Sequence, residues 1–370
     1  MAHRIIIHID FDYFYAQCEE NADPSIRGRP VVVCVYSGRT SESGVVSTSN
    51  YEARKYGVKA GVSIATAKKL LESTDATFLP MNRPHYESIS RRIMDILRDH
   101  SDIFERTGID EAYLDVSQNS NGRYDMAETI SKSLKEIVLR QEHITCSIGI
   151  APNKLLAKIA SDHVKPNGLT IVEPEVVHSF LNAQAVNRIP GVGKKVEEKL
   201  RAFNVRTIDE LARLNPVVLQ ESFGKKLGTY LFRAARGEDD EQVKDRELPT
   251  QMSRIGTLKE NTRDFTLIRP FLNELAQSLT EKLQDEEMTC KSVSIIAILS
   301  NLTIHTRSKT LESPTQELRT IDESAQQLMK EFLDSTPQTL LRRAGVKVSG
   351  LSKPSGQTNI ESFFSIRSPQ

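Results

Sequence analysis

Two short acidic clusters contain the residues of this chain that are best suited to chemistry. Asp10 and Asp12 follow the apolar run 5–9, and Asp110 and Glu111 interrupt a second largely apolar stretch. Both runs have the pattern of buried strands, and a buried carboxylate is costly unless a positive charge compensates it. A hard cation such as Mg²⁺ does so with oxygen ligands. One such cluster would more simply be surface acid at a strand end, but two clusters favour a shared metal site.

Carboxylates from two neighbouring strands can hold a pair of Mg²⁺ ions about 4 Å apart, the arrangement used for in-line nucleotidyl transfer. One ion would activate an attacking hydroxyl, and the other would hold a triphosphate. In such a site Asp10 and Asp110 would bridge the two ions. Glu111 would serve the ion on the nucleophile side, and the backbone carbonyl of Phe11 would complete the other coordination shell. The spacing assigns no metal to Asp12.

Three further residues could bind a triphosphate. Tyr51 and Arg54 are three positions apart and would share one helical face, where a phenol and a guanidinium together suit a phosphate. Taken alone, such a pair is more often solvated. Lys165, near the end of a helix expected from residue 152, could reach a triphosphate as a mobile point charge. It could equally be a helix-end cation that the macrodipole favours.

The segment 189–194, Ile-Pro-Gly-Val-Gly-Lys, precedes an amphipathic helix and is typical of a helix-hairpin-helix motif. Its glycines let backbone N–H groups approach a phosphate, so contact with DNA would not depend on base sequence. A related Phe-Gly-Lys-Lys-Leu-Gly follows at 223–228. Such turns also occur in proteins that bind no DNA, but two of them in a basic region favour DNA binding. The candidate DNA contacts are Gly191, Gly193, Lys194, Gly224 and Lys225.

Composition and charge agree with an enzyme that handles a polyanion locally. The net charge is zero over 370 residues, which by itself argues weakly against nucleic acid. Residues 165–236, however, contain twelve Lys and Arg against seven Asp and Glu, so a basic surface is expected there. No stretch predicts a membrane span or a secretion signal. The four cysteines are isolated and are expected to be buried thiols in a reducing compartment.

The length of 370 residues predicts two to four domains. Strand-like and helix-like runs alternate up to about residue 165, which indicates an α/β unit. Helices interrupted at Gly57 and Gly61 are expected within 53–71, short amphipathic helices within 176–236, and a linker over 237–250. A further α+β domain is predicted at 255–348, and the polar last twenty residues are expected to be disordered.

The tail contains the pattern Q-x-x-I-x-x-F-F, in which the apolar residues fall on one side of a single helical turn. Such a segment could fill an apolar pocket when a disordered tail folds on a partner. A terminal turn packed on its own domain is the alternative. The four residues are Gln357, Ile360, Phe363 and Phe364.

Taken together, the chain resembles the Y-family (translesion) DNA polymerases, specifically the DinB, or DNA polymerase IV, branch in its archaeal form. The resemblance extends from about Arg4 to Val348, and its motifs occur in family order. They are the segments 9–17, 50–54, 109–115, 157–162 and 165–168. The family fold implies an α/β and α+β multidomain right hand. Its parts would be a palm at 1–10 and 77–166, small fingers at 11–76, a helix-hairpin-helix thumb at 167–236, a linker at 237–250, a little finger at 251–348 and a flexible tail at 349–370.

By that similarity, Asp10, Asp110 and Glu111 are the metal carboxylates, and the nucleotide-binding residues are Tyr15, Tyr51, Arg54 and Lys165. Tyr15 would be the steric gate, since an aromatic ring beneath the sugar would exclude a ribose 2′-hydroxyl. The tail motif resembles one that binds the sliding clamp of archaea and eukaryotes. The resemblance implies primer-template DNA, deoxynucleoside triphosphates and the clamp as partners of a monomer at the nucleoid in the cytoplasm.

The implied activity is low-fidelity synthesis past damaged bases by two-metal nucleotidyl transfer. Because no separate exonuclease-like acidic domain is visible, proofreading is not expected. Two positions depart from the family: Gly108 stands where Ser is common, and Ser49 where Ala is common. Both are expected to lie near the active site, and neither removes a metal ligand.

Two rival functions remain to be weighed. A nucleotide cyclase has a physically similar palm, but it predicts a glycine-rich acidic turn in place of 109–111 and has no use for hairpin thumbs. A clamp-recruited DNA-binding scaffold with an inactive palm predicts the loss of at least one of the three carboxylates. All three are present.

Overall fold

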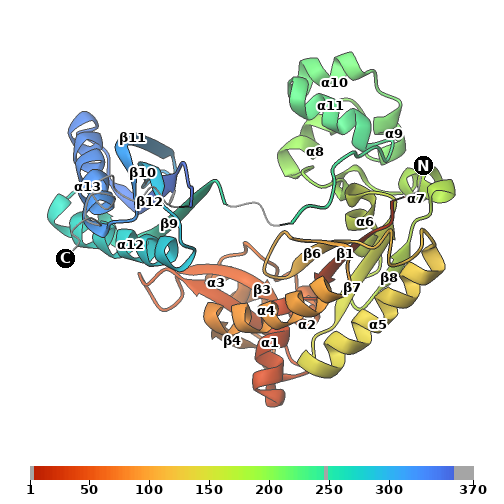
Figure 1. Ribbon diagram of the computed structural model, residues 1–370. Coiled ribbons are helices and arrows are strands. Elements are labelled where there is room, and N and C mark those ends of the chain that lie inside the picture. The colour runs from red at the N-terminus through yellow and green to blue at the C-terminus, as the bar shows by residue number, and fades with distance from the viewer. Residues whose placement is uncertain (1–3, 246–248, 354–370) are drawn as a thin grey trace, which may run out of the picture. The chain divides into compact units, whose positions relative to one another are not determined.

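The computed structural model describes residues 4–245 and 249–353 of the chain (Figure 1). Among these residues, no helix combines the length and the apolar character needed to cross a membrane. The chain forms two compact units. The first comprises 1–35 and 45–246, and the second comprises 36–44 and 247–370.

A five-stranded sheet in the order β5-β6-β1-β7-β8 forms the centre of the first unit. Its strands are β1 (Ile6–Phe11), β5 (Ile103–Arg106), β6 (Glu111–Asp115), β7 (Cys146–Ala151) and β8 (Leu169–Ile171). Strand β1 is antiparallel to both β6 and β7, and β8 is parallel to β7. The strands predicted over 5–9 and 145–150 are therefore confirmed.

The two faces of β1 follow from the alternation of its side chains. Ile5, Ile7 and Ile9 belong to the core that α4 (Arg83–Asp99) and α5 (Tyr124–Glu142) cover. The intervening residues, including Ile6, point to the opposite face, which α6 (Lys154–Ser161) covers. One face of the central strand is thus wholly apolar, and the other face carries Asp10 next to α6.

A smaller sheet in the order β3-β2-β4 lies in the segment after β1. Its elements are α1 (Phe14–Ala22), β2 (Val31–Tyr36), β3 (Gly44–Ser49), α2 (Tyr51–Lys55), α3 (Ile64–Leu70) and β4 (Thr77–Pro80). The helix interruptions predicted at Gly57 and Gly61 are confirmed, since both have positive φ, 82° and 86°. Glycine adopts this conformation without the penalty of a side chain.

Short helices fill residues 177–234, as the sequence predicts. They are α7 (Val177–Asn182), α8 (Lys194–Arg201), α9 (Ile208–Ala212), α10 (Pro216–Phe223) and α11 (Lys225–Ala234). Single 3₁₀ turns occur at 24–26, 174–176 and 186–188. The apolar side chains of these helices share one core with α6, so the helical part is packed onto the palm-like sheet through α6.

Residues 237–245, the first part of the segment expected as a linker, lie against α6. The Asp239 carboxylate accepts a hydrogen bond from the Leu155 N–H at 3.0 Å, and Lys154 Nζ lies 2.7 Å from Glu241 Oε1. Val243 is buried in the same core. Acidic residues at a helix N-terminus are favoured by its dipole, and this explains how a segment without apolar period is held in place.

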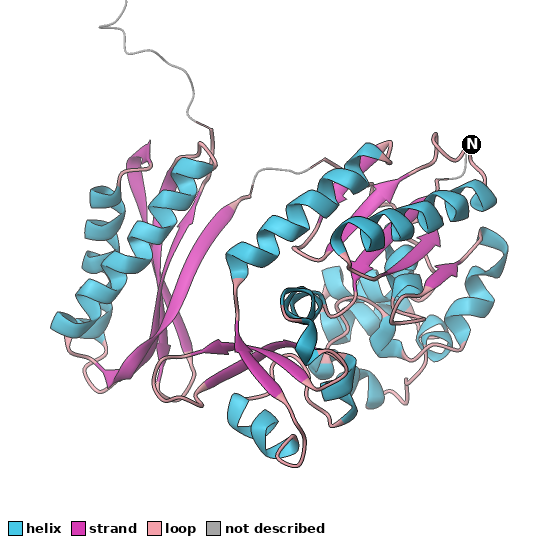
Figure 2. Cartoon of the chain, turned by 90° about the horizontal axis from the view of Figure 1, so that it is seen from below, coloured by secondary structure: helices cyan, strands magenta, loops and turns pink. Residues whose placement is uncertain are grey.

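The second unit contains a four-stranded antiparallel sheet in the order β11-β10-β12-β9. Its elements are β9 (Gln251–Thr262), α12 (Phe265–Asp285), β10 (Cys290–Leu299), β11 (Ile304–Thr315), α13 (Leu318–Ser335) and β12 (Leu341–Ser349). Both helices contribute to one core with the sheet, and Figure 2 shows them beside its strands. The α+β domain predicted at 255–348 is confirmed, and all four cysteines of the chain are buried.

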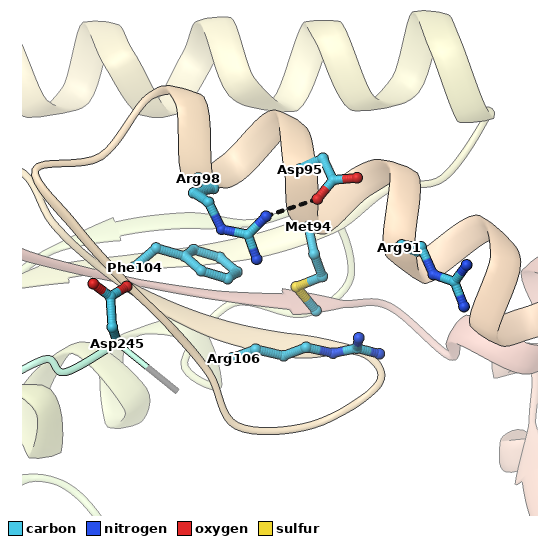
Figure 3. Close-up of a pocket in the computed structure, with 7 residues that line it drawn as sticks. All are labelled: Arg91, Met94, Asp95, Arg98, Phe104, Arg106 and Asp245. Carbon is cyan, nitrogen blue, oxygen red and sulfur yellow. Dashed lines mark hydrogen bonds and ion pairs between the residues drawn. The ribbon is translucent and has the colours of Figure 1, made fainter. Parts of the chain in front are cut away.

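A hollow of about 320 Å³ lies between α4 and β5 of the first unit (Figure 3). Three arginines line it, and the guanidinium groups of two of them have partners. Arg98 pairs with Asp95 at 2.8 Å and lies over the ring of Phe104. Arg106 donates hydrogen bonds to Gly108 and Ser90. This hollow contains none of the candidate site residues.

Candidate active site

Strand β1 brings Asp10 to the face of the sheet that α6 covers, together with His8. Across the ladder between β1 and β6, the partner of Asp10 is Glu111. Paired positions on neighbouring antiparallel strands have their β-carbons about 5 Å apart. The register therefore brings together one carboxylate from each of the two acidic clusters.

Asp110 lies in the turn that leads into β6. Its carbonyl accepts a hydrogen bond from the Phe11 N–H at 2.8 Å, which ties the turn to the end of β1. Arg106 donates to the Gly108 carbonyl at 2.8 Å and steadies the same turn. A Cβ at Gly108 would lie 3.1 Å from Glu111 Cγ and 3.3 Å from Asp110 Oδ1. Glycine at this position thus leaves both acids more room than serine would.

Burial makes Asp10 an unusual carboxyl group. Desolvation raises its pKa to about 6, although the nearby Lys165 opposes the shift. The pKa of Asp110 is raised as well, first by burial and then by the negative charge of Glu111. Desolvation and like charges both disfavour the ionised form, so these acids lie where a bound cation would be strongly favoured.

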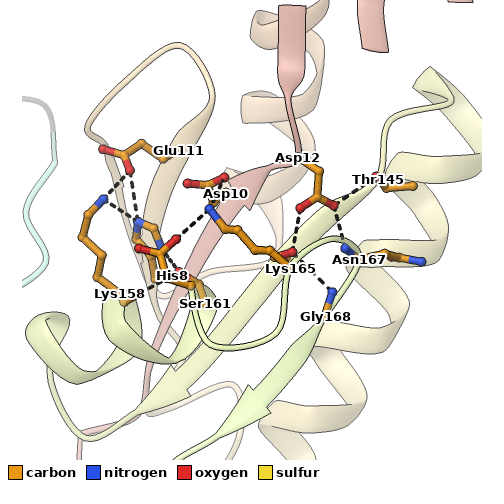
Figure 4. A network of polar contacts seen from close by, with 12 residues as sticks. His8, Asp10, Asp12, Glu111, Thr145, Lys158, Ser161, Lys165, Asn167 and Gly168 are labelled. Atoms are coloured by element: carbon orange, nitrogen blue, oxygen red, sulfur yellow. Dashed lines mark hydrogen bonds and ion pairs between the residues drawn. The ribbon is translucent and has the colours of Figure 1, made fainter. Parts of the chain in front are cut away.

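Lys165 pairs with the first acid of the site. Its Nζ lies 2.7 Å from Asp10 Oδ1 and 2.7 Å from Asp162 Oδ1 (Figure 4). Burial opposes the charged ammonium, but the attraction of Asp10 prevails and raises the pKa of Lys165 to about 12. Helix α6 ends at Ser161, so Lys165 lies in the following loop. Its ammonium nevertheless reaches Asp162, the residue that caps the C-terminus of α6.

Glu111 has two partners on its side of the site. Lys158 Nζ donates a hydrogen bond to Glu111 Oε2, and His8 Nε2 lies 3.5 Å from the same oxygen. The contact with His8, and after it the contact with Lys158, lower the pKa of Glu111 to about 2. Burial lowers the pKa of His8 to about 4, so at neutral pH the imidazole is uncharged and Lys158 supplies the positive charge.

The donor set fits a hard divalent cation, because its side chains offer carboxylate oxygens in a partly buried setting. Within residues 4–245 and 249–353, no three metal-ligand side chains are gathered closely enough to form a site by themselves. Lys165 and Lys158 hold Asp10 and Glu111 through their oxygens instead. A cation that binds these oxygens would compete with the two ammonium groups.

Tyr51 and Arg54 lie together as their helical spacing predicts. The Arg54 guanidinium is 4.8 Å from the centroid of the Tyr51 ring, and Arg54 Nε donates to the carbonyl of Ser49 at 3.0 Å. The pKa of Tyr51 is raised by burial and by Asp12, while Arg54 and Lys165 oppose the shift. Tyr51 thus lies within the electrostatic field of the site.

Tyr15 stacks on Tyr86, with ring centroids 4.6 Å apart and planes inclined by 16°. Its pKa is raised by burial and then by Asp110, which places the ring in the neighbourhood of that acid. Ser49 is fully buried and donates to the Val58 carbonyl at 2.8 Å. The serine that departs from the family thus takes part in internal hydrogen bonding.

The predicted hairpin glycines have the backbone that such turns require. Gly191 and Gly224 have φ of 84° and 80°, and the helices α8 and α11 begin immediately after Gly193 and Gly224. A surface depression of about 480 Å³ joins Gly191 and Gly193 to Lys158 of α6. The first hairpin therefore borders the acidic site.

The predicted clamp-binding residues of the tail lie outside the described residues. They are Gln357, Ile360, Phe363 and Phe364.

Sequence reasoning assigned no role to Lys158 and His8, the two residues that contact Glu111. Lys158 belongs to a recognised family motif, and His8 interrupts an apolar run, which is the one local sign of a special position. Asp12 lies just past the end of β1, which ends at Phe11. The contacts of Lys158 and His8 with Glu111 join segments that are far apart in the sequence.

The chain matches three protein-family models. The impB/mucB/samB family model matches residues 9–162, and the model of its C-terminal domain matches residues 249–361. The model described as the DNA polymerase-iota thumb domain matches residues 187–239. The last match coincides with the helices that carry the two hairpins.

Relatives and solved structures match nearly the whole chain. DNA polymerase IV of Nitrosopumilus maritimus is 45% identical over 98% of this chain and 100% of that protein. DNA polymerase IV of Methanosarcina acetivorans is 42% identical over 97% and 99%.

Among structures, the Y-family DNA polymerase chimera Dbh-Dpo4(243-245)-Dbh has a TM-score of 0.88 and 37% identity, covering 94% of this chain and 98% of that one. An insertion ternary complex of Dbh DNA polymerase has a TM-score of 0.69 at 37% identity, covering 93% and 98%. With its carboxylates, palm-like sheet and helical thumb in place, the chain belongs to the Y-family DNA polymerases, in the DNA polymerase IV branch, and is a DNA-directed DNA polymerase.

Proposed function

We propose that this polymerase copies damaged DNA with low fidelity through two Mg²⁺ ions held by Asp10, Asp110, Glu111 and the carbonyl of Phe11. The observation that supports this most directly is the pairing of Asp10 with Glu111 across β1 and β6, beside the turn that carries Asp110. When bound, the ions would supply the charge that activates the primer 3′-hydroxyl and neutralises the triphosphate.

The side chains around the acids would bind and orient the nucleotide. Lys165 can exchange its contact with Asp10 for a phosphate oxygen without leaving the site, because its Nζ already lies beside that acid. Arg54 would offer a planar set of donors and Tyr51 a neutral one. Tyr15 would exclude a ribose by filling the space beneath the sugar. These roles divide the work into triphosphate binding and sugar selection.

The DNA itself would be held through the two thumb hairpins. Gly191, Gly193 and Gly224 expose backbone N–H groups at the starts of α8 and α11, next to Lys194 and Lys225. Such contacts to phosphates fix the duplex without reading its sequence. Dbh in its insertion ternary complex is a related polymerase with both substrates, which supports DNA and deoxynucleotides as ligands here.

Primer extension on undamaged and abasic templates tests the metal assignment. Asp110→Ala should reduce incorporation on both templates by at least about 10³-fold, because the acid would help to hold the charge on which the chemistry depends. Asp102→Ala, which alters an acid immediately before β5, serves as the matched control. Equal incorporation by the wild type and Asp110→Ala would overturn the assignment, and a 3′-exonuclease activity of the wild type would overturn the absence of proofreading.

We further propose that the tail recruits a sliding clamp through Gln357, Ile360, Phe363 and Phe364. The support is the spacing of these residues in the sequence and the resemblance of the motif. Replacing both phenylalanines by alanine should abolish stimulation by an archaeal clamp while distributive synthesis continues. Undiminished stimulation would mean that the tail has another role.

A further inference from the structure

Asp12 is a buried acid that the metal site does not use. Its side chain is 1% exposed, and its carboxylate accepts hydrogen bonds from three donors (Figure 4). Ser147 Oγ donates to Oδ1 at 2.7 Å, and Thr145 Oγ1 donates to Oδ2 at 3.0 Å. The third donor is the backbone N–H of Asn167, which lies 2.8 Å from Oδ2. Buried polar groups need such partners, and here one of them belongs to a functional loop.

The backbone of Asp12 is fixed as well. Its N–H donates to the Thr145 carbonyl at 3.1 Å. The side chain of Gln17, on α1, donates to the Asp12 carbonyl and accepts from the Thr145 N–H at 2.9 Å. The carboxylate is therefore presented from a rigid position at the junction of β1 and β7.

The loop that Asp12 holds connects α6 with β8. Asn167 has φ of 58°, and a Cβ at Gly168 would lie 1.7 Å from the Val164 carbonyl oxygen, so the turn is tight. The Gly168 N–H donates to Ser147 Oγ at 3.3 Å, and Lys135 Nζ donates to the Gly168 carbonyl at 3.2 Å. Ser147 thus contacts both Asp12 and the turn.

Lys165 lies two residues before the peptide that Asp12 holds. The side chain of Lys165 extends to the metal-site acid: its Nζ is 2.7 Å from Asp10 Oδ1. One short segment of chain, Asp10 to Asp12, therefore contacts this loop twice. Asp10 contacts the lysine ammonium, and Asp12 contacts the Asn167 backbone.

We propose that Asp12 is a positioning residue that holds the 165–168 turn, so that Lys165 meets the triphosphate of the incoming nucleotide. This inference rests on the proposed role of Lys165 in triphosphate binding. A competing view gives Asp12 only a stabilising role between β1 and β7. The two views differ in one respect: only positioning makes the effect of Asp12 depend on Lys165.

The positioning role and the purely stabilising role can be separated by steady-state kinetics. Incorporation of a single deoxynucleotide is measured in the wild-type and Lys165→Ala backgrounds. Asp12→Ala should raise the nucleotide KM about 10- to 100-fold in the wild type, the range expected when a charged hydrogen bond is lost. In the Lys165→Ala background it should change KM by less than about twofold, because two mutations that act through one contact are not additive. A similar rise in both backgrounds would overturn the proposal.

Two variants control for stability. Asp12→Asn can turn its amide oxygen to the Asn167 N–H and its NH₂ group to Ser147 Oγ, so it should restore KM to within a few-fold of wild type. Thr145→Val removes a donor to Asp12 without touching the turn, and it should lower the melting temperature while leaving KM unchanged. If Asp12→Ala does not fold, Asp12→Ser replaces it, since its shorter side chain cannot match the reach of the carboxylate.

Amide hydrogen exchange gives a readout that is independent of activity. Asp12→Ala or Asp12→Ser should accelerate exchange in a peptide spanning 163–168, whereas Thr145→Val should not. Unchanged exchange there would overturn the proposal. Lys165→Ala alone tests the premise that Lys165 binds the triphosphate. If this variant leaves the nucleotide KM unchanged, the proposed role of Lys165 fails. If it raises KM but Asp12→Ala has no effect, only the positioning role of Asp12 is rejected.

Discussion

Lys165 Nζ and Asp10 Oδ1 lie 2.7 Å apart, in a site where burial raises the pKa of that carboxyl to about 6. The acid most central to the proposed metal site is thus held by a lysine that we assign to the triphosphate. Lys158 and Glu111 form a second pair of the same kind. In both pairs a basic side chain compensates a partly buried negative charge, and in both the ammonium group would compete with a bound cation.

Removing the charge of Lys158 should ease cation binding. Lys158→Met leaves Glu111 without its ammonium partner, so the half-saturating Mg²⁺ concentration should fall about two- to fivefold, since partly exposed ion pairs contribute up to about 1 kcal/mol. A Mg²⁺ titration of primer extension measures this. Lys154→Met is the matched control, because Lys154 lies on the same helix and pairs with Glu105 and Glu241. A higher requirement for Mg²⁺ in Lys158→Met would show that Lys158 supports the bound state.

The raised pKa of Asp10 predicts a pH dependence of stability. The folded protein binds this proton up to about pH 6, whereas the unfolded chain releases it near the ordinary value of 3.8. Ionising Asp10 therefore destabilises the fold as pH rises through this window. The free energy of unfolding of Asp10→Asn, relative to wild type, should increase by about 1 to 3 kcal/mol between pH 4 and pH 7 without added metal.

Urea unfolding at a series of pH values measures this difference. Asp125→Asn provides a control of opposite sign, because a hydrogen bond from Arg123 lowers the pKa of that exposed carboxyl. Its stability relative to wild type should fall as pH rises to the ordinary carboxyl value of 3.8 and change little above about pH 5. A flat difference for Asp10→Asn would show that Lys165 fully compensates the charge.

Tyr15→Ala should admit ribonucleotides. Removing the ring opens the space beneath the sugar, so the ratio of kcat/KM for ribonucleotide to that for deoxynucleotide should rise about 10- to 200-fold. Single-nucleotide insertion with matched pairs of triphosphates measures the ratio. Tyr15→Phe keeps the ring that stacks on Tyr86 and should retain the selectivity of the wild type. An unchanged ratio in Tyr15→Ala would refute the steric gate.

The thumb lysines should contribute phosphate contacts that depend on salt. Lys194→Ala and Lys225→Ala should each weaken DNA binding and reduce the slope of log K against log salt by about one. Fluorescence anisotropy with primer-template DNA across a range of salt concentrations measures the slope. Lys132→Ala, on α5 and paired with Glu128, should leave it unaltered. If both thumb variants have the slope of the wild type, neither Lys194 nor Lys225 contacts a DNA phosphate.

Local patterns were enough to predict the main strands, the interrupted helices near Gly57 and Gly61, and the acids of the site. Alternation along β1 places Asp10 on one face, and a glycine-rich turn needs only a few neighbouring residues to be recognised. The family motifs then supplied the multidomain fold. Such features repeat over short distances, so the sequence carries them directly.

Only the tertiary structure decided which basic residue meets which acid. Lys158 lies 47 positions from Glu111, and the Asn167 N–H lies 155 positions from Asp12. The packing of α6 against β1 and β7 brings these groups together. A further long-range contact ties the acidic segment after Gly237 to the start of α6. No local period encodes such pairs, because their energy depends on burial and on distances set by the whole core. The sequence by itself thus determined the acids of the site, and the fold determined the charges that hold them.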